Sequence, residues 1–242
     1  MKKKKLLFFY VLSLLFTVSC SNEDLDLGKN ESKDIDKNGS IEFIYKGKLY
    51  SSTYFSTQDS LIILNDKIAN EVYRNLGLNP ALAVVINEDG VLTYYDSYDE
   101  IPSYTSTQTN LRSTYVPTSF TVDLFEDSSY NGKRISFTID KNNTKVYIPS
   151  LRAYGMNDKI SSLKYRLART YSTEPPRYPF PFNIQFTLFE HDNYEGKSIT
   201  FASTKLYTSD TDREDTVRRL KEVSFGSGKN WNDVASSVII GQ

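Results

Sequence analysis

The sequence predicts a mainly β protein in which a small α+β domain precedes a larger β domain built from two copies of one motif. Three observations support this prediction. The 242 residues include 18 Tyr and 14 Phe but only 2 Met, and the aromatic residues favour strands. Apolar and polar residues alternate in several short runs, as in strands that are buried on one face. A stretch of 13 residues also recurs in the second half of the chain.

Residues 1–19 are typical of a secretory signal peptide. Lys2–Lys5 precede an apolar run, Leu6–Val18, which is shorter than the roughly 20 residues that a spanning helix needs. The end of this run, Thr17–Cys20, resembles the processing site of bacterial lipoproteins, in which cleavage precedes a Cys that carries lipid. Cys20 is also the one cysteine of the chain. We therefore expect lipidation at Cys20, with secretion without an anchor as the alternative.

Residues 20–40 are expected to form a disordered tether. They contain almost no apolar side chains that could be buried in a core. Acidic residues follow Cys20 closely, at Glu23, Asp24 and Asp26. This cluster is similar to the surface-export signal of Bacteroidetes lipoproteins, so the expected location is the bacterial outer membrane, on the cell surface.

Charge and composition exclude several classes of protein. Without residues 1–19 the chain has 25 basic and 30 acidic residues, which argues against a nucleic-acid partner. A single Cys excludes a disulfide framework, and a single His excludes a metal centre with several His ligands. No phosphate-binding loop is present, and nothing singles out a nucleophile with a base. We therefore expect no enzymatic activity.

Residues 41–100 are predicted to form the small α+β domain. A helix is expected after Asn65, with Ile68, Val72 and Leu76 on its buried face and Gly77 at its end. Turn residues separate the strand-like runs, which are Ile41–Tyr45, Lys48–Tyr54, Ser60–Leu64, Leu82–Ile86 and Val91–Tyr95. Four tyrosines could form either a binding face or an outer sheet surface, namely Tyr94, Tyr95, Tyr98 and Tyr104. A linker rich in Ser, Thr and Pro follows at 101–117.

The recurring stretch predicts two folded hairpins in the larger domain, residues 118–242. Phe125–Phe137 and Phe189–Phe201 align without gaps, and each contains an aromatic residue, then Tyr, then Gly. The Gly suits a positive φ, and the two aromatic rings can pack across the turn. A hydroxyl residue four positions after the Gly, Ser136 or Thr200, is expected to bond the hairpin backbone.

A second motif follows each hairpin, and its residues suit a calcium ion. Asn157–Ser162 and Asn232–Ser237 agree at four of six positions. Their Asn, Asp and Ser side chains, with backbone carbonyls, are hard oxygen donors, of which calcium takes six to eight. No soft ligand that would favour zinc or copper is present. Asn65–Asn70 shares the first four residues but lacks both hydroxyls and follows no hairpin, so we reject it as a site.

Together the two motifs resemble those of a βγ-crystallin domain of the microbial, calcium-binding type. That family consists of two Greek keys, each with such a hairpin and such a loop, so the resemblance implies a double Greek-key sandwich that binds two calcium ions. Side chains at the second and fifth loop positions would be ligands, together with carbonyls of the third position and of the residue after the first hairpin aromatic. The implied ligands are Glu126, Asp158, Lys159, Ser161, Glu190, Asp233, Val234 and Ser236, and Asn157 and Asn232 would brace the loops.

Two further expectations concern affinity and the longer second key. Each site would hold about one carboxylate, which suggests dissociation constants of roughly 10⁻⁵ to 10⁻³ M. In the second key Asn232 lies 36 positions after Gly196, whereas in the first key Asn157 lies 25 positions after Gly132. Its extra segment, Ser209–Lys221, is expected to form a short helix.

The expected function is therefore that of a lipid-anchored, surface-exposed calcium-binding protein with a structural, adhesive or ligand-binding role. Its contact with the membrane would be the lipid on Cys20, and its ligand would be a protein or a glycan. One alternative is a crystallin-fold protease inhibitor or another protein-targeting module. The other is a glycan-binding lipoprotein that uses exposed Tyr residues.

Overall fold

The protein is described by a computed structural model that covers residues 39–57, 60–87, 89–102, 114–172, 184–202 and 213–241. By its internal contacts the chain divides into residues 1–34 and 35–242, and all described residues belong to the second unit. The predicted signal peptide, the lipidation site Cys20 and most of the predicted tether lie outside the described residues.

The N-terminal part contains five strands and one helix, largely where the sequence predicts them. Their bounds are Gly39–Tyr45 for β1, Lys48–Ser56 for β2, Ile62–Leu64 for β3, Lys67–Leu76 for α1, Ala83–Ile86 for β4 and Leu92–Tyr95 for β5, and a 3-10 turn, η1, spans Tyr98–Glu100. The hairpin between β1 and β2 turns at Lys46 and Gly47, whose φ angles are 50° and 74°. Positive φ at both positions matches the twist of the flanking strands.

The helix α1 differs from the prediction at its start and in its buried face. Asp66, not Asn65, caps it, because the Asp66 carboxylate accepts a hydrogen bond of 2.7 Å from the backbone N–H of Ala69. Its buried residues are Ala69, Tyr73 and Leu76, whereas Ile68 is 60% exposed. The helix buries this neighbouring face because it carries Tyr73, whose large ring is fully buried in the core.

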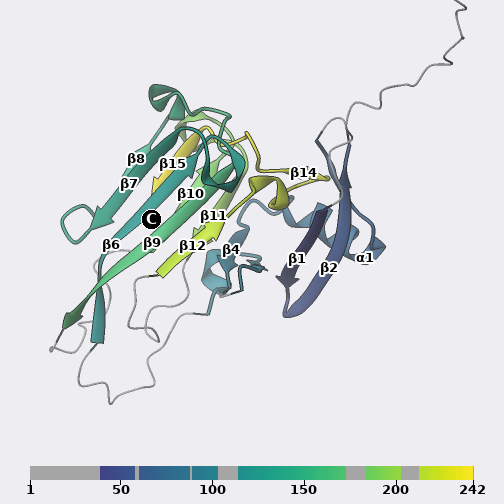
Figure 1. Cartoon of the computed structure of the whole chain (residues 1–242), viewed down its shortest axis with the longest axis horizontal. Helices are drawn as coiled ribbons and strands as arrows, with labels where there is room; N and C mark the ends of the chain where they lie inside the picture. The colour runs from purple at the N-terminus through teal and green to yellow at the C-terminus, as the bar shows by residue number, and fades with distance from the viewer. Residues whose placement is uncertain are drawn as a thin grey trace, which may run out of the picture. The chain divides into compact units, whose positions relative to one another are not determined.

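The larger part consists of two Greek keys that exchange strands. The first key contains β6 (Thr114–Phe125), β7 (Arg134–Asp140), β8 (Val146–Ile148) and β9 (Ser162–Ser172), and the second contains β10 (Gln185–Phe189), β11 (Ser198–Ala202), β12 (Arg213–Val217) and β15 (Ser237–Ile240). In each key the first strand pairs with the second and the fourth, while the third strand joins the sheet of the other key. Figure 1 shows the long strands β6 and β9 side by side. The predicted fold class, a mainly β protein with a double Greek key, is confirmed.

The two predicted domains share one sheet. Strand β4 pairs with β11 in parallel, with Ala83 opposite Thr200 and Val85 opposite Ala202. The order of the nine-stranded sheet is therefore β3-β2-β1-β5-β4-β11-β10-β15-β8, and the four-stranded sheet runs β12-β9-β6-β7. Strand β6 begins at Thr114, inside the predicted linker 101–117.

The prediction of a helix over Ser209–Lys221 is wrong from residue 213 on, and residues 209–212 lie outside the described residues. Arg213–Val217 form strand β12, which pairs antiparallel with β9, and only a 3-10 turn, η5, follows at Leu220–Glu222. The acidic start and basic end of this segment would stabilise a helix by only a few tenths of a kcal/mol. The hydrogen bonds and burial that β12 gains at the edge of the other key's sheet outweigh this preference.

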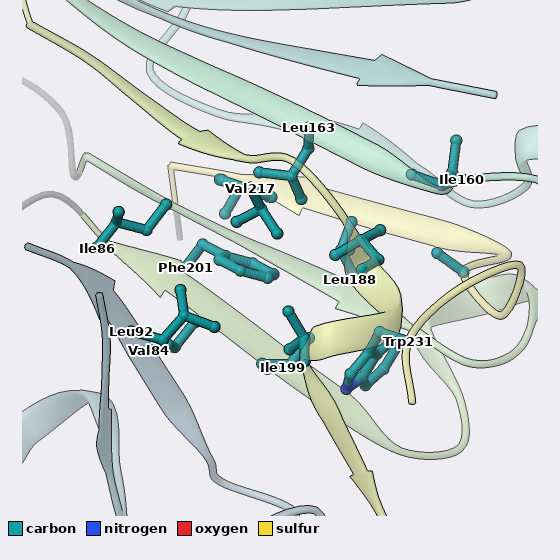
Figure 2. Close-up of a cluster of buried hydrophobic side chains, with 14 of the residues drawn as sticks. Val84, Ile86, Leu92, Ile160, Leu163, Leu188, Ile199, Phe201, Val217 and Trp231 are labelled. Atoms are coloured by element: carbon teal, nitrogen blue, oxygen red, sulfur yellow. The ribbon is translucent and has the colours of Figure 1, made fainter. Parts of the chain in front are cut away.

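One continuous apolar core joins the keys to the N-terminal strands. Figure 2 shows Phe201 with Val84 and Leu92 on one side and Leu163 and Val217 on the other. Phe201 stacks on Phe186 with ring centroids 5.0 Å apart. Because the core draws on elements from Ile41 to Ile240, neither part buries its apolar surface alone.

The longer second key contains an inserted hairpin, β13 (Ser224–Gly226) and β14 (Lys229–Asn230), that packs against α1. The Ser224 hydroxyl donates to the carbonyl of Tyr73 at 2.5 Å, and the Ser227 N–H donates to the carbonyl of Arg74 at 2.9 Å. Gly77 and Gly226 allow the backbones to approach, since a Cβ on Gly77 would lie 2.0 Å from the Gly226 nitrogen. We call this segment, residues 223–230, the docking hairpin.

We predict that Gly77→Ala destabilises the protein by about 3 kcal/mol or more, the upper end for overpacking, because two backbone segments would have to separate. Gly47→Ala is the matched control. Gly47 has φ 74° with open space around its Cα, so its replacement costs only the left-handed conformation, about 1–2 kcal/mol. Denaturant unfolding measures both changes, and an equal or smaller loss for Gly77→Ala would contradict the proposed close contact.

Candidate metal centre

Both hairpins fold as the sequence predicts. The rings of Phe125 and Tyr130 meet edge to face with centroids 5.8 Å apart, and those of Phe189 and Tyr194 do so at 5.7 Å. The glycines that follow, at positions 132 and 196, have φ angles of 73° and 79°. A side chain at either position would meet the hairpin within 3.0 Å, so glycine is required there.

The hydroxyl groups that bond the hairpins are not the predicted ones. The Ser162 hydroxyl accepts from the Tyr130 N–H at 3.0 Å and donates to the carbonyl of Asp127 at 2.6 Å. Ser237 makes the same two bonds in the second key, at 3.0 and 2.6 Å. The predicted Ser136 and Thr200 instead bond side chains across the strands. The last residue of each loop motif thus joins that loop to the hairpin of its own key.

The two loops lie against each other and exchange backbone hydrogen bonds. The Asp158 N–H donates to the carbonyl of Ala235 at 3.1 Å, and the Asp233 N–H donates to the carbonyl of Ile160 at 3.0 Å. Both aspartates have positive φ, 51° and 55°. Ile160 and Ala235 are fully buried, so the loops rest on the core.

This contact brings the predicted ligand side chains together in pairs across the two keys. The Ser236 hydroxyl donates to Asp158 Oδ1 at 2.9 Å, and the Ser161 hydroxyl donates to Asp233 Oδ1 at 2.9 Å. Each pair therefore takes its carboxylate from one key and its hydroxyl from the other. We call these pairs, with their neighbours, the Asp158 site and the Asp233 site.

The remaining predicted ligands lie next to the pairs along the chain. The Ser161 N–H bonds the carbonyl of Phe125 at 3.0 Å, which brings the next residue, Glu126, to the Asp233 site. The equivalent bond from Ser236 to Phe189, at 2.9 Å, brings Glu190 to the Asp158 site. Lys159 and Val234 follow the two aspartates in sequence. One pocket is lined by Asp158, Glu190, Asp233, Val234 and Ser236, with Arg152, His191, Asp192, Asn193 and Glu195.

The electrostatics of the Asp233 site favour a cation. Asp233 is exposed as a residue, but partial burial of its carboxyl raises its pKa. The hydrogen bond from Ser161 lowers the pKa, while the negative charges of Asp127, Asp158 and Glu126 raise it. A bound cation would relieve this repulsion. Lys159 neutralises part of it, because its ammonium lies 3.0 Å from the Glu126 carboxylate and lowers the pKa of Glu126.

The asparagines at the first loop positions contact the aspartates that follow them. Asn157 Nδ2 donates to Asp158 Oδ2 at 2.5 Å, and Asn232 Nδ2 donates to Asp233 Oδ2 at 2.6 Å. Each carboxylate is therefore held at both oxygens, by its own loop and by the serine of the other. This agrees with the expected bracing role of Asn157 and Asn232.

The donor chemistry fits calcium better than a transition metal. Among the described residues no group of three or more His, Cys, Asp or Glu side chains is arranged to hold a metal ion. Each site instead offers one carboxylate from one loop, one hydroxyl from the other loop and nearby backbone carbonyls. Such mixed oxygen donors suit calcium, which accepts irregular shells completed by water.

Two other sequence expectations have a clear outcome. Asp66, in the rejected copy of the loop motif, is occupied as the cap of α1. The four predicted tyrosines do not form one exposed face, because Tyr94 is buried while Tyr98 is 37% exposed. Tyr104 lies outside the described residues.

The solved structures with a weak likeness to this chain are βγ-crystallin domains. No protein-family model and no curated protein matches the chain. Among solved structures, a βγ-crystallin from Ciona intestinalis is 18% identical over 50% of this chain and 99% of its own, with a TM-score of 0.28. A βγ-crystallin domain from Flavobacterium johnsoniae is 23% identical over 50% and 94%, with a TM-score of 0.27. A double mutant of a domain from Clostridium beijerinckii is 20% identical over 50% and 98%, with a TM-score of 0.26. Likeness at this level says nothing about a ligand.

We predict that Ser162→Ala lowers the free energy of unfolding by about 1–3 kcal/mol, because it leaves the partly buried N–H of Tyr130 and the carbonyl of Asp127 without their partner. Ser136→Ala is the control, since Ser136 is exposed and its loss costs about 0.5 kcal/mol or less. Thermal and denaturant unfolding measure both variants. The opposite ranking would show that Ser136 holds the hairpin, as the sequence suggests.

Proposed function

We propose that the twin loops bind two calcium ions and that the protein is a lipid-anchored module of the cell surface with a structural, adhesive or ligand-binding role. The reciprocal pairing of Asp158 with Ser236 and of Asp233 with Ser161 carries this proposal. It places oxygen donors from both keys at each site, around carboxylates that are already oriented. Binding, not catalysis, is the proposed activity.

Bound calcium would act as a cross-brace between the keys. Each ion would contact an aspartate of one key and a serine of the other, so unfolding either key would release it. An ion that binds only the folded state stabilises that state by an amount that grows with its concentration. With one carboxylate side chain at each site the affinity is modest, roughly 10⁻⁵ to 10⁻³ M, which is suited to extracellular calcium.

We expect calorimetric titration of the full-length protein with calcium to show two ions bound and a higher melting temperature. Ser161→Arg combined with Ser236→Arg should abolish both effects, because a guanidinium would occupy each site. The isosteric pair Asp158→Asn and Asp233→Asn is a second variant that removes charge with little change in volume. Equal melting temperatures of the wild type with and without millimolar calcium would contradict the proposal. The variants are informative if, without calcium, they melt at the same temperature as the wild type.

The raised pKa of Asp233 predicts a pH dependence whose sign calcium reverses. The folded protein binds a proton at Asp233 more tightly than the unfolded chain, where the pKa is about 3.9. Without calcium, the contribution of Asp233 to stability is therefore full below that value and falls as pH rises through the raised pKa. With calcium, which requires the carboxylate, stability should rise with pH over the same range. Unfolding of the wild type and of Asp233→Asn between pH 3 and 7, with calcium or with a chelator, tests both signs.

The proposed anchoring depends on Cys20. No helix in the described part of the chain is long and apolar enough to cross a membrane. A lipid on Cys20, followed by the acidic tether, would hold the protein at the outer surface. We predict that Cys20→Ser moves the protein from the membrane fraction to the soluble fraction and removes labelling by a fatty-acid probe. Protease treatment of intact cells should degrade the wild-type protein, and its full protection would contradict surface display.

A further inference from the structure

Asn230, in β14 of the docking hairpin, links the N-terminal part of the protein to the second loop. Its side chain is almost fully buried, and both ends of its amide are hydrogen-bonded. Asn230 Nδ2 donates to the carbonyl of Ser60 at 2.9 Å, and Asn230 Oδ1 accepts from the Asn232 N–H at 3.1 Å. A buried amide with both groups satisfied holds its partners in a fixed geometry.

The chain of hydrogen bonds continues from Asn230 to the Asp233 site. Asn232, whose N–H is held by Asn230, donates its own side-chain amide to Asp233 Oδ2 at 2.6 Å. The other carboxylate oxygen of Asp233 accepts from Ser161. An unbroken series of contacts therefore runs from the Ser60 carbonyl to the predicted ligand Asp233.

The Ser60 end of this series is itself firmly placed. Ser60 has a positive φ of 59°, and its N–H donates to the carbonyl of Thr57 at 3.0 Å. Two residues later, the Ile62 N–H donates to the carbonyl of Gly228 in the docking hairpin at 2.8 Å. Movement of the docking hairpin away from β3 would therefore pull on Asn230 and on the loop that follows it.

The Asp158 site has no equivalent link. The residue two positions before Asn157 is Gly155, where the second key has Asn230 two positions before Asn232. Glycine has no side chain that could accept from the Asn157 N–H. The hydrogen bonds to the two aspartates, from the preceding asparagine and from the serine of the other loop, are equivalent, so the link is the main difference in how the two carboxylates are held.

We propose that Asn230 is a positioning residue that makes the Asp233 site, and not the Asp158 site, depend on the docking of the N-terminal part. This inference rests on the proposed calcium binding. Outer partners that orient a metal ligand typically contribute about 10–100-fold in affinity. The two calcium sites are therefore unequal, and contacts to the N-terminal strands regulate only one of them.

The first measurement needs no metal. In the full-length protein with a chelator, Asn230→Ala should speed hydrogen exchange at the amides of Asn232 and Asp233, read by NMR, because the acceptor that orders Asn232 is lost. Exchange at Asn157 and Asp158 should stay at the wild-type rate. Ser224→Ala is the matched control for the loss of a buried hydrogen bond in the docking hairpin. The bonds from Ser227 to Arg74 and from Ile62 to Gly228 still hold the hairpin in place, and the bonds of Asn230 stay intact. Ser224→Ala should leave exchange at all four amides unchanged.

The second measurement separates the two sites by calcium titration. In a Ser236→Arg background only the Asp233 site remains, and Asn230→Ala should weaken calcium binding there about tenfold or more. In a Ser161→Arg background only the Asp158 site remains, and the same change should alter its affinity by less than about twofold. Ser224→Ala should leave both affinities unchanged.

Equal losses in the two backgrounds, or none in either, would overturn the proposal, as would unchanged exchange at Asn232. If the wild-type protein binds no calcium at all, the proposed function fails and the difference in affinity fails with it. The exchange measurement then still decides whether Asn230 positions Asn232.

Discussion

The two Greek keys depend on what each contributes to the other. Each sends its third strand into its partner's sheet, and the loops then exchange backbone bonds and pair each aspartate with the other key's serine. The same relation recurs just beyond the loops, where the Leu151 N–H donates to the carbonyl of Ser236 and the Leu220 N–H to that of Ser161, both at 2.8 Å. Because these contacts are reciprocal, neither key has a complete core, sheet or loop by itself. A cation between the loops would strengthen a junction that the chain already forms.

The features that the sequence predicts well are local or repeated. The hairpins follow from glycines that need positive φ and from aromatic residues at fixed spacing, and both copies fold alike. The pairing of the loops could be predicted only from a family resemblance, since no local property of Asp158 indicates that Ser236, 78 residues away, will contact it. The missed features are long-range: β12 forms because an edge of the other sheet is available to it, and α1 buries the face that carries Tyr73 into the core. Ser162 and Ser237 stand at identical positions in both loops, a signal that was sufficient to suggest a shared role.

The N-terminal part breaks the near-symmetry of the keys. Strand β4 pairs with β11, whereas β7, which holds the same place in the first key, has no further strand beside it among the described residues. The docking hairpin and Asn230 likewise occur only in the second key. Duplication of a motif produces two equivalent loops. The N-terminal strands pair with the second key, which also contains the docking hairpin, and this makes the surroundings of the two loops different. The asymmetry thus lies outside the loops, in residues that no comparison of the loop motifs alone would reveal.

The ends of the sheets have a consequence for contacts between copies of the protein. Exposed strand edges can pair with other chains and seed aggregates. The nine-stranded sheet ends in β3 and β8, each only three residues long, and β12, at the edge of the four-stranded sheet, begins with the charged residues Arg213, Glu214 and Asp215. Of the described edge strands β7 alone is long, and it begins with Arg134 and ends with Asp140. Short or charged borders of this kind oppose pairing of one molecule's sheet edge with that of another.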